Sequence, residues 1–212
     1  MNDELSFLED VPPETLIAQI SRHNVLQEDM ERLLCLENIR KAWLNDQIIN
    51  AYLKLIENAA EKVGVLDVYF FTSILDCKET AKHYIKDMHR GKDIILIPAC
   101  NKGRDHWTLL VVDLKKDSVI VVDSMRSKTN PGVILIEYMR KNPLLGKNKV
   151  WTINVLKGLP KQQNGCDCGI FMCQNAVKMA FDLPQFVVQE EIHWIRRAMA
   201  VEILTGRLMP RI

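Results

Sequence analysis

The clearest helical pattern in the chain follows Asn45. Apolar residues recur from Ile48 to Val63 at the spacing of one helix face, which predicts a helix of about four turns that buries this face. Asparagine is a preferred N-cap residue, so we expect the helix to begin directly after Asn45. Trp43 and Asp46 would then lie at its exposed start.

Short apolar runs separated by polar turns predict a sheet in the middle of the chain. Residues 94–98 have the composition of a buried strand. Residues 107–113 and 118–123 form two more strands around a polar turn, and we expect them to pair as a hairpin. A further strand is predicted at 150–156, and helices are predicted at 80–89, at 133–141, from 168 onward and at 190–204.

The remaining segments carry less regular patterns. Residues 68–71 are aromatic and β-prone, and residues 33–36 are also predicted as a short strand. Residues 1–30 combine acidic residues with a Pro12–Pro13 break and a short amphipathic run at 16–20. We expect this N-terminal segment to be an accessory helical arm without a chemical role.

Cys168 stands where the pattern changes from loop to helix. Residues 160–167 are mostly polar and contain a glycine, and apolar residues at helical spacing follow Cys168. The partial positive charge of a helix N-terminus favours a thiolate over a thiol, which makes a cysteine nucleophilic near neutral pH. Gln162 lies six residues upstream, where a glycine-bearing loop would let its amide fold back beside the sulfur as an oxyanion donor. This arrangement is typical of acyl transfer.

His106 and Asp123 flank the predicted hairpin and would supply the base that such a nucleophile needs. The polar turn at 114–117 places their side chains either directly opposite or diagonally across the two strands. Directly opposite Cβ atoms lie about 4.5 to 5.5 Å apart, within reach of an imidazole–carboxylate hydrogen bond. The sequence thus offers a nucleophile, an oxyanion donor, a base and a residue that orients the base.

Composition favours one domain and excludes several function classes. The 212 residues, 48% of them hydrophobic, are enough to bury one sizeable core. A net charge of +1 gives no sequence-wide reason to propose nucleic acid or an anionic membrane as partner. The acidic start has no apolar signal region, and the longest aliphatic runs, such as Ile94 to Ile97, are far too short to span a bilayer. We expect a soluble, intracellular protein whose six cysteines are free thiols.

Each of these residues also has a simpler interpretation. Read singly, Cys168 is more simply a small buried thiol, His106 a loop histidine and Asp123 a capping acid. Their joint occurrence favours catalysis. Cys166 is a rival nucleophile. Cys166, Cys168 and Cys173 together also suggest a zinc site, but the sequence has no set of four zinc ligands at standard spacing. A redox pair is weak because a single residue separates Cys166 from Cys168.

Four blocks of residues resemble the Ulp/SENP cysteine proteases, which process SUMO. They are Trp-Leu-Asn-Asp-Gln-Ile-Ile-Asn at 43–50, His-Trp at 106–107, Val-Asp-Ser-Met at 122–125 and Pro-Lys-Gln-Gln-Asn-Gly-Cys-Asp-Cys-Gly at 160–169. They occur in the family's order and with its interval of 17 residues between histidine and aspartate. Residues 196–204 are also similar to the family's C-terminal helix, so the resemblance covers nearly the whole chain from about Leu33 onward.

The resemblance implies an α+β fold with a papain-like core, a mixed sheet flanked by helices and catalytic residues in the order His, Asp, Cys. It implies a short N-terminal accessory segment at 1–30 and a catalytic domain at 31–212. The implied roles are Cys168 as nucleophile, His106 as base, Asp123 as its orienter and Gln162 as oxyanion-hole donor. Trp43 and Trp107 would clamp the Gly-Gly tail of the modifier, and Asp46 would meet a basic residue on it. Position 166 is variable in the family, which argues against Cys166 as nucleophile.

The expected activity is cleavage after the Gly-Gly of SUMO, on lysine conjugates and possible precursors, without metal or cofactor. The expected partners are SUMO and sumoylated proteins, and neither nucleic acid nor a membrane is expected as a partner. We expect the protein to be a monomer that is located in the nucleus, the cytoplasm or both. Three alternatives stay open: a protease for another ubiquitin-like modifier, an acyltransferase on a related core, and a module that only binds SUMO. Val121 and Val122 depart from the aromatic residues common in the family, which bears on packing more than on catalysis.

Overall fold

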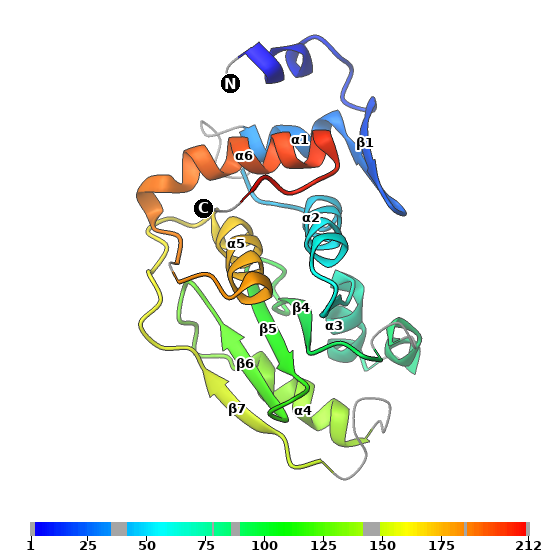
Figure 1. Cartoon of the computed structure of the whole chain (residues 1–212), viewed down its shortest axis with the longest axis vertical. Helices are drawn as coiled ribbons and strands as arrows, with labels where there is room; N and C mark the ends of the chain where they lie inside the picture. The colour runs from blue at the N-terminus through cyan, green and yellow to red at the C-terminus, as the bar shows by residue number, and fades with distance from the viewer. Residues whose placement is uncertain are drawn as a thin grey trace.

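A five-stranded mixed sheet forms the centre of the molecule in the computed structural model, which describes residues 3–34, 42–77, 79–85, 90–141, 149–184 and 186–210 (Figure 1). The middle strands are antiparallel, and each outer strand runs parallel to its neighbour. In spatial order the strands are β3 (Val63–Val65), β4 (Ile94–Cys100), β5 (Trp107–Asp113), β6 (Ser118–Val122) and β7 (Thr152–Val155).

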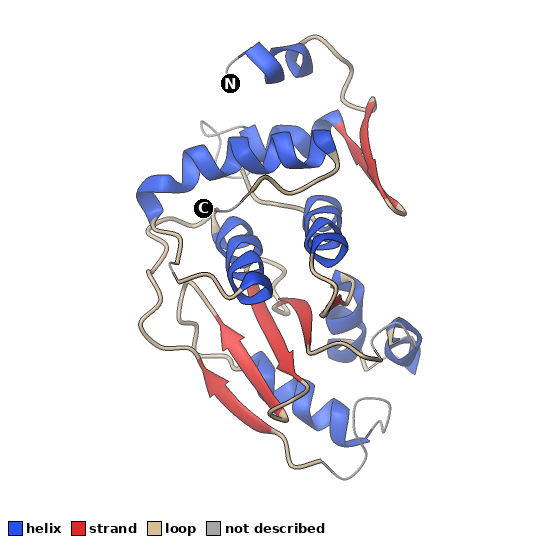
Figure 2. Cartoon of the chain, viewed as in Figure 1, coloured by secondary structure: helices blue, strands red, loops and turns tan. Residues whose placement is uncertain are grey.

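Helices cover both faces of this sheet (Figure 2). One face packs on α2 (Asp46–Ala59) and α5 (Cys168–Phe181), against which α6 (Ile192–Thr205) packs in turn, and the other face packs on α3 (Val68–Leu75) and α4 (Pro131–Lys141). Successive strand residues point to opposite faces, so Leu109 joins the first core while Leu110 joins the second. Burial on both faces explains why β4 and β5 are almost continuously apolar.

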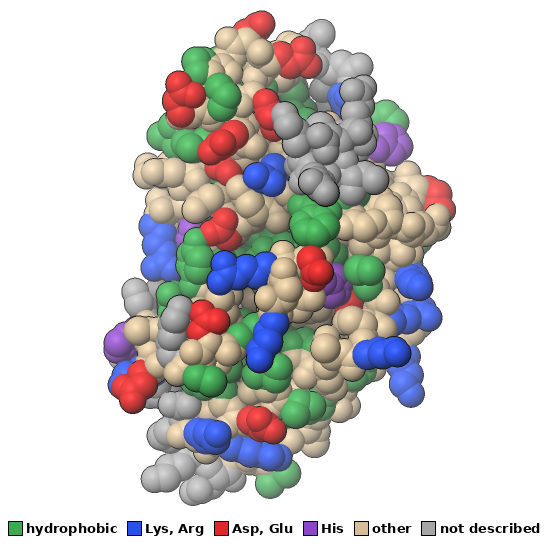
Figure 3. Space-filling model, turned by 180° about the vertical axis from the view of Figure 1, so that it is seen from behind, with side chains coloured by type: hydrophobic (Ala, Val, Ile, Leu, Met, Phe, Trp, Pro, Cys, Tyr) green, Lys and Arg blue, Asp and Glu red, His purple; other side chains and the backbone are tan. Residues whose placement is uncertain are grey.

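The N-terminal segment packs on the first core. It consists of η1 (Asp3–Glu9), a hairpin of β1 (Leu16–Ile20) and β2 (His23–Leu26), and α1 (Gln27–Leu34). Leu5, Val25 and Met30 belong to the same hydrophobic cluster as α2, α5 and α6. On the face drawn in Figure 3, acidic side chains are the more frequent charged groups over the upper end, and basic side chains mixed with acidic ones lie over the lower end.

Most predicted elements are confirmed. Asn45 caps α2, and its side-chain oxygen accepts a hydrogen bond from the Ile48 amide at 3.2 Å. The strands expected at 94–98, 107–113, 118–123 and 150–156 and the helices expected at 133–141, from 168 and at 190–204 are all present, with ends that shift by a few residues. Val63, which we placed at the end of the first helix, instead begins β3.

Three local predictions are wrong, and a fourth is met only in part. The run at 16–20 is a strand rather than a helix, because Ser21 takes a left-handed turn conformation that lets β2 fold back onto it. Residues 68–71 are helical because the Asp67 carboxylate caps the Tyr69 amide and α3 buries Phe70 and Phe71. Leu33 and Leu34 end α1, not a strand, and 35–36 lie outside the described residues. The helix expected at 80–89 is a 3-10 helix, η2 (Glu79–Tyr84), and 86–89 are likewise outside.

Candidate active site

Cys168 is the first residue of α5, as the loop-to-helix pattern predicts. Its side chain is nearly buried. The residue before it, Asp167, occupies the N-cap position but makes no side-chain capping bond to the helix. The free amides of the first helical turn therefore remain beside the sulfur, where a helix N-terminus attracts negative charge.

His106 and Asp123 meet through a hydrogen bond across the hairpin. β5 and β6 pair Leu109 with Val122, so the histidine and the aspartate lie diagonally, which is one of the two placements that the turn allows. His106 Nε2 lies 2.7 Å from Asp123 Oδ1, and both side chains are buried. The predicted histidine–carboxylate pair is thus present.

Asp123 is fixed as a carboxylate by a small cage of donors. The amide of Met125 donates to Oδ1 at 2.9 Å, and the amide of Ser127 donates to Oδ2 at 2.8 Å. The Ser127 hydroxyl also donates to Oδ2. Burial alone would raise the pKa of Asp123, but the hydrogen bonds from His106, Ser127 and these amides hold it well below its usual range. Sequence reasoning missed Ser127, whose only signal is its place four residues after the aspartate.

The second ring nitrogen of His106 is available to the thiol. Nδ1 is buried and makes no hydrogen bond to any described residue. Burial alone would lower the pKa of His106, but the hydrogen bond to Asp123 and the neighbouring Cys168 side chain raise it to about 9. The imidazole therefore lies between a fixed carboxylate and a thiol, which is the arrangement that moves a proton to and from sulfur.

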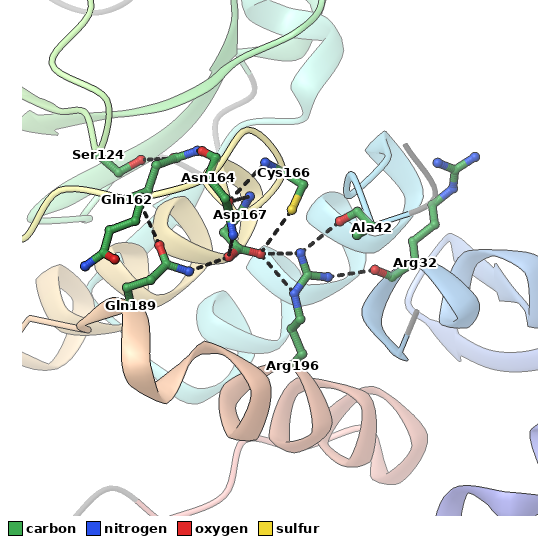
Figure 4. Close-up of polar contacts among 10 residues, drawn as sticks. Arg32, Ala42, Ser124, Gln162, Asn164, Cys166, Asp167, Gln189 and Arg196 are labelled. Carbon is green, nitrogen blue, oxygen red and sulfur yellow. Dashed lines mark hydrogen bonds and ion pairs between the residues drawn. The ribbon is translucent and has the colours of Figure 1, made fainter. Parts of the chain in front are cut away.

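Gln162 is held in one orientation by its neighbours in the loop (Figure 4). Its Oε1 accepts a hydrogen bond from the Ser124 hydroxyl at 2.7 Å, and its Nε2 donates to the Asn164 carbonyl at 2.7 Å. The Gln162 main-chain amide also donates to the Ser124 carbonyl, at 3.2 Å. Ser124 directly follows Asp123, so one turn after β6 orients both the histidine and the glutamine. Sequence reasoning missed this role of Ser124.

A cavity of about 580 Å³ opens beside the sulfur, and Cys168, Trp43, Asp46 and Trp107 all line it. The Trp107 indole donates from Nε1 to the Leu44 carbonyl at 3.1 Å, which ties the β5 end of the cavity to the segment before α2. Asp46 accepts a hydrogen bond from the Tyr69 hydroxyl. That bond, together with burial, raises the pKa of Tyr69 to about 12. The structure thus gathers the predicted substrate-binding residues around one cavity.

The rival interpretations of Cys166 find little support in its surroundings. Burial and the adjacent Asp167 carboxylate, whose Oδ1 lies 3.8 Å from Cys166 Sγ, raise the pKa of the thiol. A raised pKa keeps a cysteine protonated and less nucleophilic. Within the described ranges, no group of three or more His, Cys, Asp or Glu side chains is arranged to hold a metal ion. None of the described helices is both long and apolar enough to cross a membrane.

The fold and the arrangement of Cys168, His106 and Asp123 are those of a papain-like α+β cysteine protease domain. The chain belongs to the Ulp1 protease family: residues 42–208 match the model of that family's C-terminal catalytic domain.

Among curated proteins, human sentrin-specific protease 2 is 31% identical over 182 residues, covering 79% of this chain and 31% of that protein. Mouse sentrin-specific protease 2 is 28% identical over 213 residues, covering 93% of this chain and 35% of that protein. The chain thus spans about a third of the length of these relatives.

Solved structures agree on the fold. The X-ray structure of the C-terminal Ulp1 protease domain in complex with Smt3, the yeast ortholog of SUMO, superimposes with a TM-score of 0.78 at 25% identity, covering 97% of this chain and 94% of that one. The Ulp1-like SUMO protease catalytic domain of Chaetomium thermophilum gives a TM-score of 0.80 at 22% identity, covering 99% and 90%.

Proposed function

We propose that this chain is a cysteine protease and isopeptidase that cleaves after the C-terminal Gly-Gly of SUMO, releasing SUMO from target lysines and maturing SUMO precursors. The observation that carries the proposal is the placement of the Cys168 thiol at one cavity with Trp43 and Trp107 while the bonded pair of His106 and Asp123 acts on it. A nucleophile, its base and a site for a narrow tail are thereby combined.

The proposed reaction begins once the proton of the Cys168 thiol has moved to Nδ1 of His106, a transfer that the raised pKa of His106 favours. The sulfur then attacks the carbonyl carbon of the terminal glycine. Negative charge develops on the carbonyl oxygen, where the Gln162 amide and the Cys168 main-chain amide would stabilise it. Removing one such donor typically costs about 2.7 to 4 kcal/mol of barrier.

The C–N bond then breaks, and His106 gives its proton to the departing lysine amine. Water attacks the remaining thioester with His106 again as base, which releases the carboxylate of the modifier and restores the thiol. Asp123 keeps the proton of His106 on Nε2 in the neutral ring, so that Nδ1 faces the sulfur as an acceptor. It also stabilises the imidazolium that forms during both steps.

The proposed selectivity comes from Trp43 and Trp107. Two aromatic rings that close on an extended tail leave room for glycine and exclude residues with a Cβ atom. Affinity would come from a broader surface on the folded modifier, with Asp46 meeting a basic residue on it. The similarity to a sentrin-specific protease and to a Ulp1 domain in complex with the yeast ortholog of SUMO favours SUMO over other ubiquitin-like modifiers.

The test is turnover of an isopeptide-linked SUMO conjugate and of a SUMO precursor, with a ubiquitin conjugate alongside. We expect the wild-type protein to cleave both SUMO substrates and Cys168→Ala to cleave neither while still binding SUMO. Cys166→Ala is the matched control, because it removes a buried thiol two residues away, and it should remain active. Full activity of Cys168→Ala, or cleavage of the ubiquitin conjugate alone, would contradict the proposal.

A further inference from the structure

The Asp167 carboxylate, next to the nucleophile, is buried and bonded on both oxygens (Figure 4). Oδ1 accepts hydrogen bonds from Arg196 Nη2 at 2.6 Å and Arg196 Nε at 3.1 Å. Oδ2 accepts hydrogen bonds from Asn164 Nδ2 at 2.6 Å and Gln189 Nε2 at 2.7 Å. Burial alone would raise the pKa of Asp167, but these donors, led by Arg196, lower it. The side chain therefore remains an anion inside the protein.

The bonds of Asp167 extend through the loop to the oxyanion donor. Asn164, which donates to Asp167, accepts hydrogen bonds at its own Oδ1 from the amides of Cys166 and Asp167, each at 3.1 Å. Its main-chain carbonyl accepts the hydrogen bond from Gln162 Nε2. One carboxylate thus fixes the turn that carries both Gln162 and Cys168.

Arg196 extends the same network to the other wall of the cavity. This α6 side chain is 1% exposed, and all three of its guanidinium nitrogens are bonded. In addition to the bonds that Nε and Nη2 make to Asp167, Nη1 donates to the Arg32 carbonyl at 2.8 Å and Nη2 donates to the Ala42 carbonyl at 2.9 Å. Ala42 directly precedes Trp43.

Three consecutive carbonyls around Trp43 accept hydrogen bonds from side chains. The Ala42 carbonyl accepts from Arg196, the Trp43 carbonyl accepts from Arg32 Nη1 at 3.3 Å, and the Leu44 carbonyl accepts from Trp107 Nε1 at 3.1 Å. Residues 42–44 belong to no strand. These side-chain donors therefore replace the sheet bonds that would otherwise fix an extended segment.

We propose that Arg196 and Asp167 are positioning residues for the reaction: together they hold the turn of Gln162 and Cys168 in register with the Trp43 segment. This inference rests on the proposed function, because it assigns the pair to the alignment of the glycine carbonyl with the sulfur. This hydrogen-bond network explains why position 196 in α6 requires an arginine rather than another basic residue. A lysine would keep the charge, but one nitrogen cannot replace three nitrogens that are bonded in different directions.

The test compares Arg196→Lys with wild type and with Tyr52→Phe, all at a temperature where each is fully folded. Tyr52 is a matched control because its hydroxyl donates to Glu202 Oε2 at 2.6 Å and accepts from Gln174 Nε2 at 2.9 Å, linking α2 to α6 and α5 away from the turn. For Arg196→Lys we expect kcat/KM on a SUMO conjugate to fall by about 100-fold, the loss that a misplacement of about 1 Å can cause. Both kcat and KM should change, since both walls of the cavity move.

A substrate-independent measurement separates this inference from the proposed function. The rate of Cys168 alkylation by iodoacetamide, followed by mass spectrometry across pH, reports the placement of the thiol against His106. In Arg196→Lys we expect alkylation near neutral pH to slow by about 10-fold, a part of that misplacement cost, while Tyr52→Phe matches wild type. Normal alkylation and kinetics in Arg196→Lys would overturn the positioning role. A wild type that cleaves no SUMO substrate would overturn the proposed function instead, and alkylation would still decide the role of Arg196.

Discussion

A single added methyl group at Gly169 should separate the nucleophile from its cavity. Gly169 follows Cys168 in α5, and a Cβ atom built on it would lie 2.9 Å from Cβ, 3.1 Å from Cγ and 3.2 Å from Cδ1 of Leu44. Leu44 is buried, and its carbonyl holds the Trp107 indole. The substitution Gly169→Ala therefore pushes α5 away from the segment that carries Trp43.

The size of the effect follows from the contact distance. Carbon atoms pack at about 3.5 Å or more, so a contact of 2.9 Å must open by about 0.6 Å. Overpacking of this kind costs about 1 to 3 kcal/mol, and the better helix propensity of alanine returns up to about 1 kcal/mol. Stability should thus fall by only about 1 kcal/mol. Catalysis should suffer more, because a misplacement of about 1 Å can cost 100-fold and 0.6 Å corresponds to roughly 10-fold.

The assay is kcat/KM on a SUMO conjugate, with the free energy of unfolding measured in urea. Gly165→Ala is the matched control, since an added Cβ at Gly165 meets no atom within 4 Å, and it should keep wild-type kinetics. The reasoning is refuted if Gly169→Ala has wild-type kcat/KM, or if Gly165→Ala loses as much activity as Gly169→Ala.

Two further predictions concern the hydrogen bonds of the site. Ser124→Ala removes the hydrogen bond that orients Gln162. Steady-state kinetics should give a kcat that is lower by about 10-fold, a smaller loss than removal of a whole oxyanion donor causes, and a KM that is little changed. A normal kcat would refute the orienting role of Ser124. The pKa of His106 is raised from 6.5 to about 9 in the folded protein. Protonation of His106 therefore stabilises the native state fully at pH values below about 6.5, and this stabilisation is lost as the pH rises through about 9. Urea unfolding should show that the free energy of unfolding falls less over this pH range in Asp123→Asn than in wild type. Equal falls in wild type and Asp123→Asn would contradict the role of Asp123 in raising the pKa of His106.

The sequence was sufficient where one local rule decides the structure. The cap at Asn45, the helix start at Cys168 and the polar turn between two apolar strands each determine a local geometry, and together they bring His106 and Asp123 into contact. Family resemblance then supplied Trp43, Asp46 and Trp107, which all line the cavity.

The sequence was insufficient where distant groups decide. The short apolar run at 68–71 fits a strand or a helix, and its helical form depends on the Asp67 cap and on burial against the sheet. The bond between Asp167 and Arg196 joins residues 29 positions apart. Neither helix periodicity nor charge pattern predicts that an arginine of the last helix points into the loop before the nucleophile, because both rules describe neighbours within one element.

The central claim is that Cys168 is the nucleophile of a SUMO-specific site, and one measurement tests it most directly. Ubiquitin-like modifiers that carry a C-terminal electrophile are incubated with wild type, Cys168→Ala and Cys166→Ala, and covalent adducts are counted by mass spectrometry. We expect SUMO alone to label wild type and Cys166→Ala, and no modifier to label Cys168→Ala. Labelling that persists in Cys168→Ala, labelling by another modifier only, or none in wild type would contradict the claim.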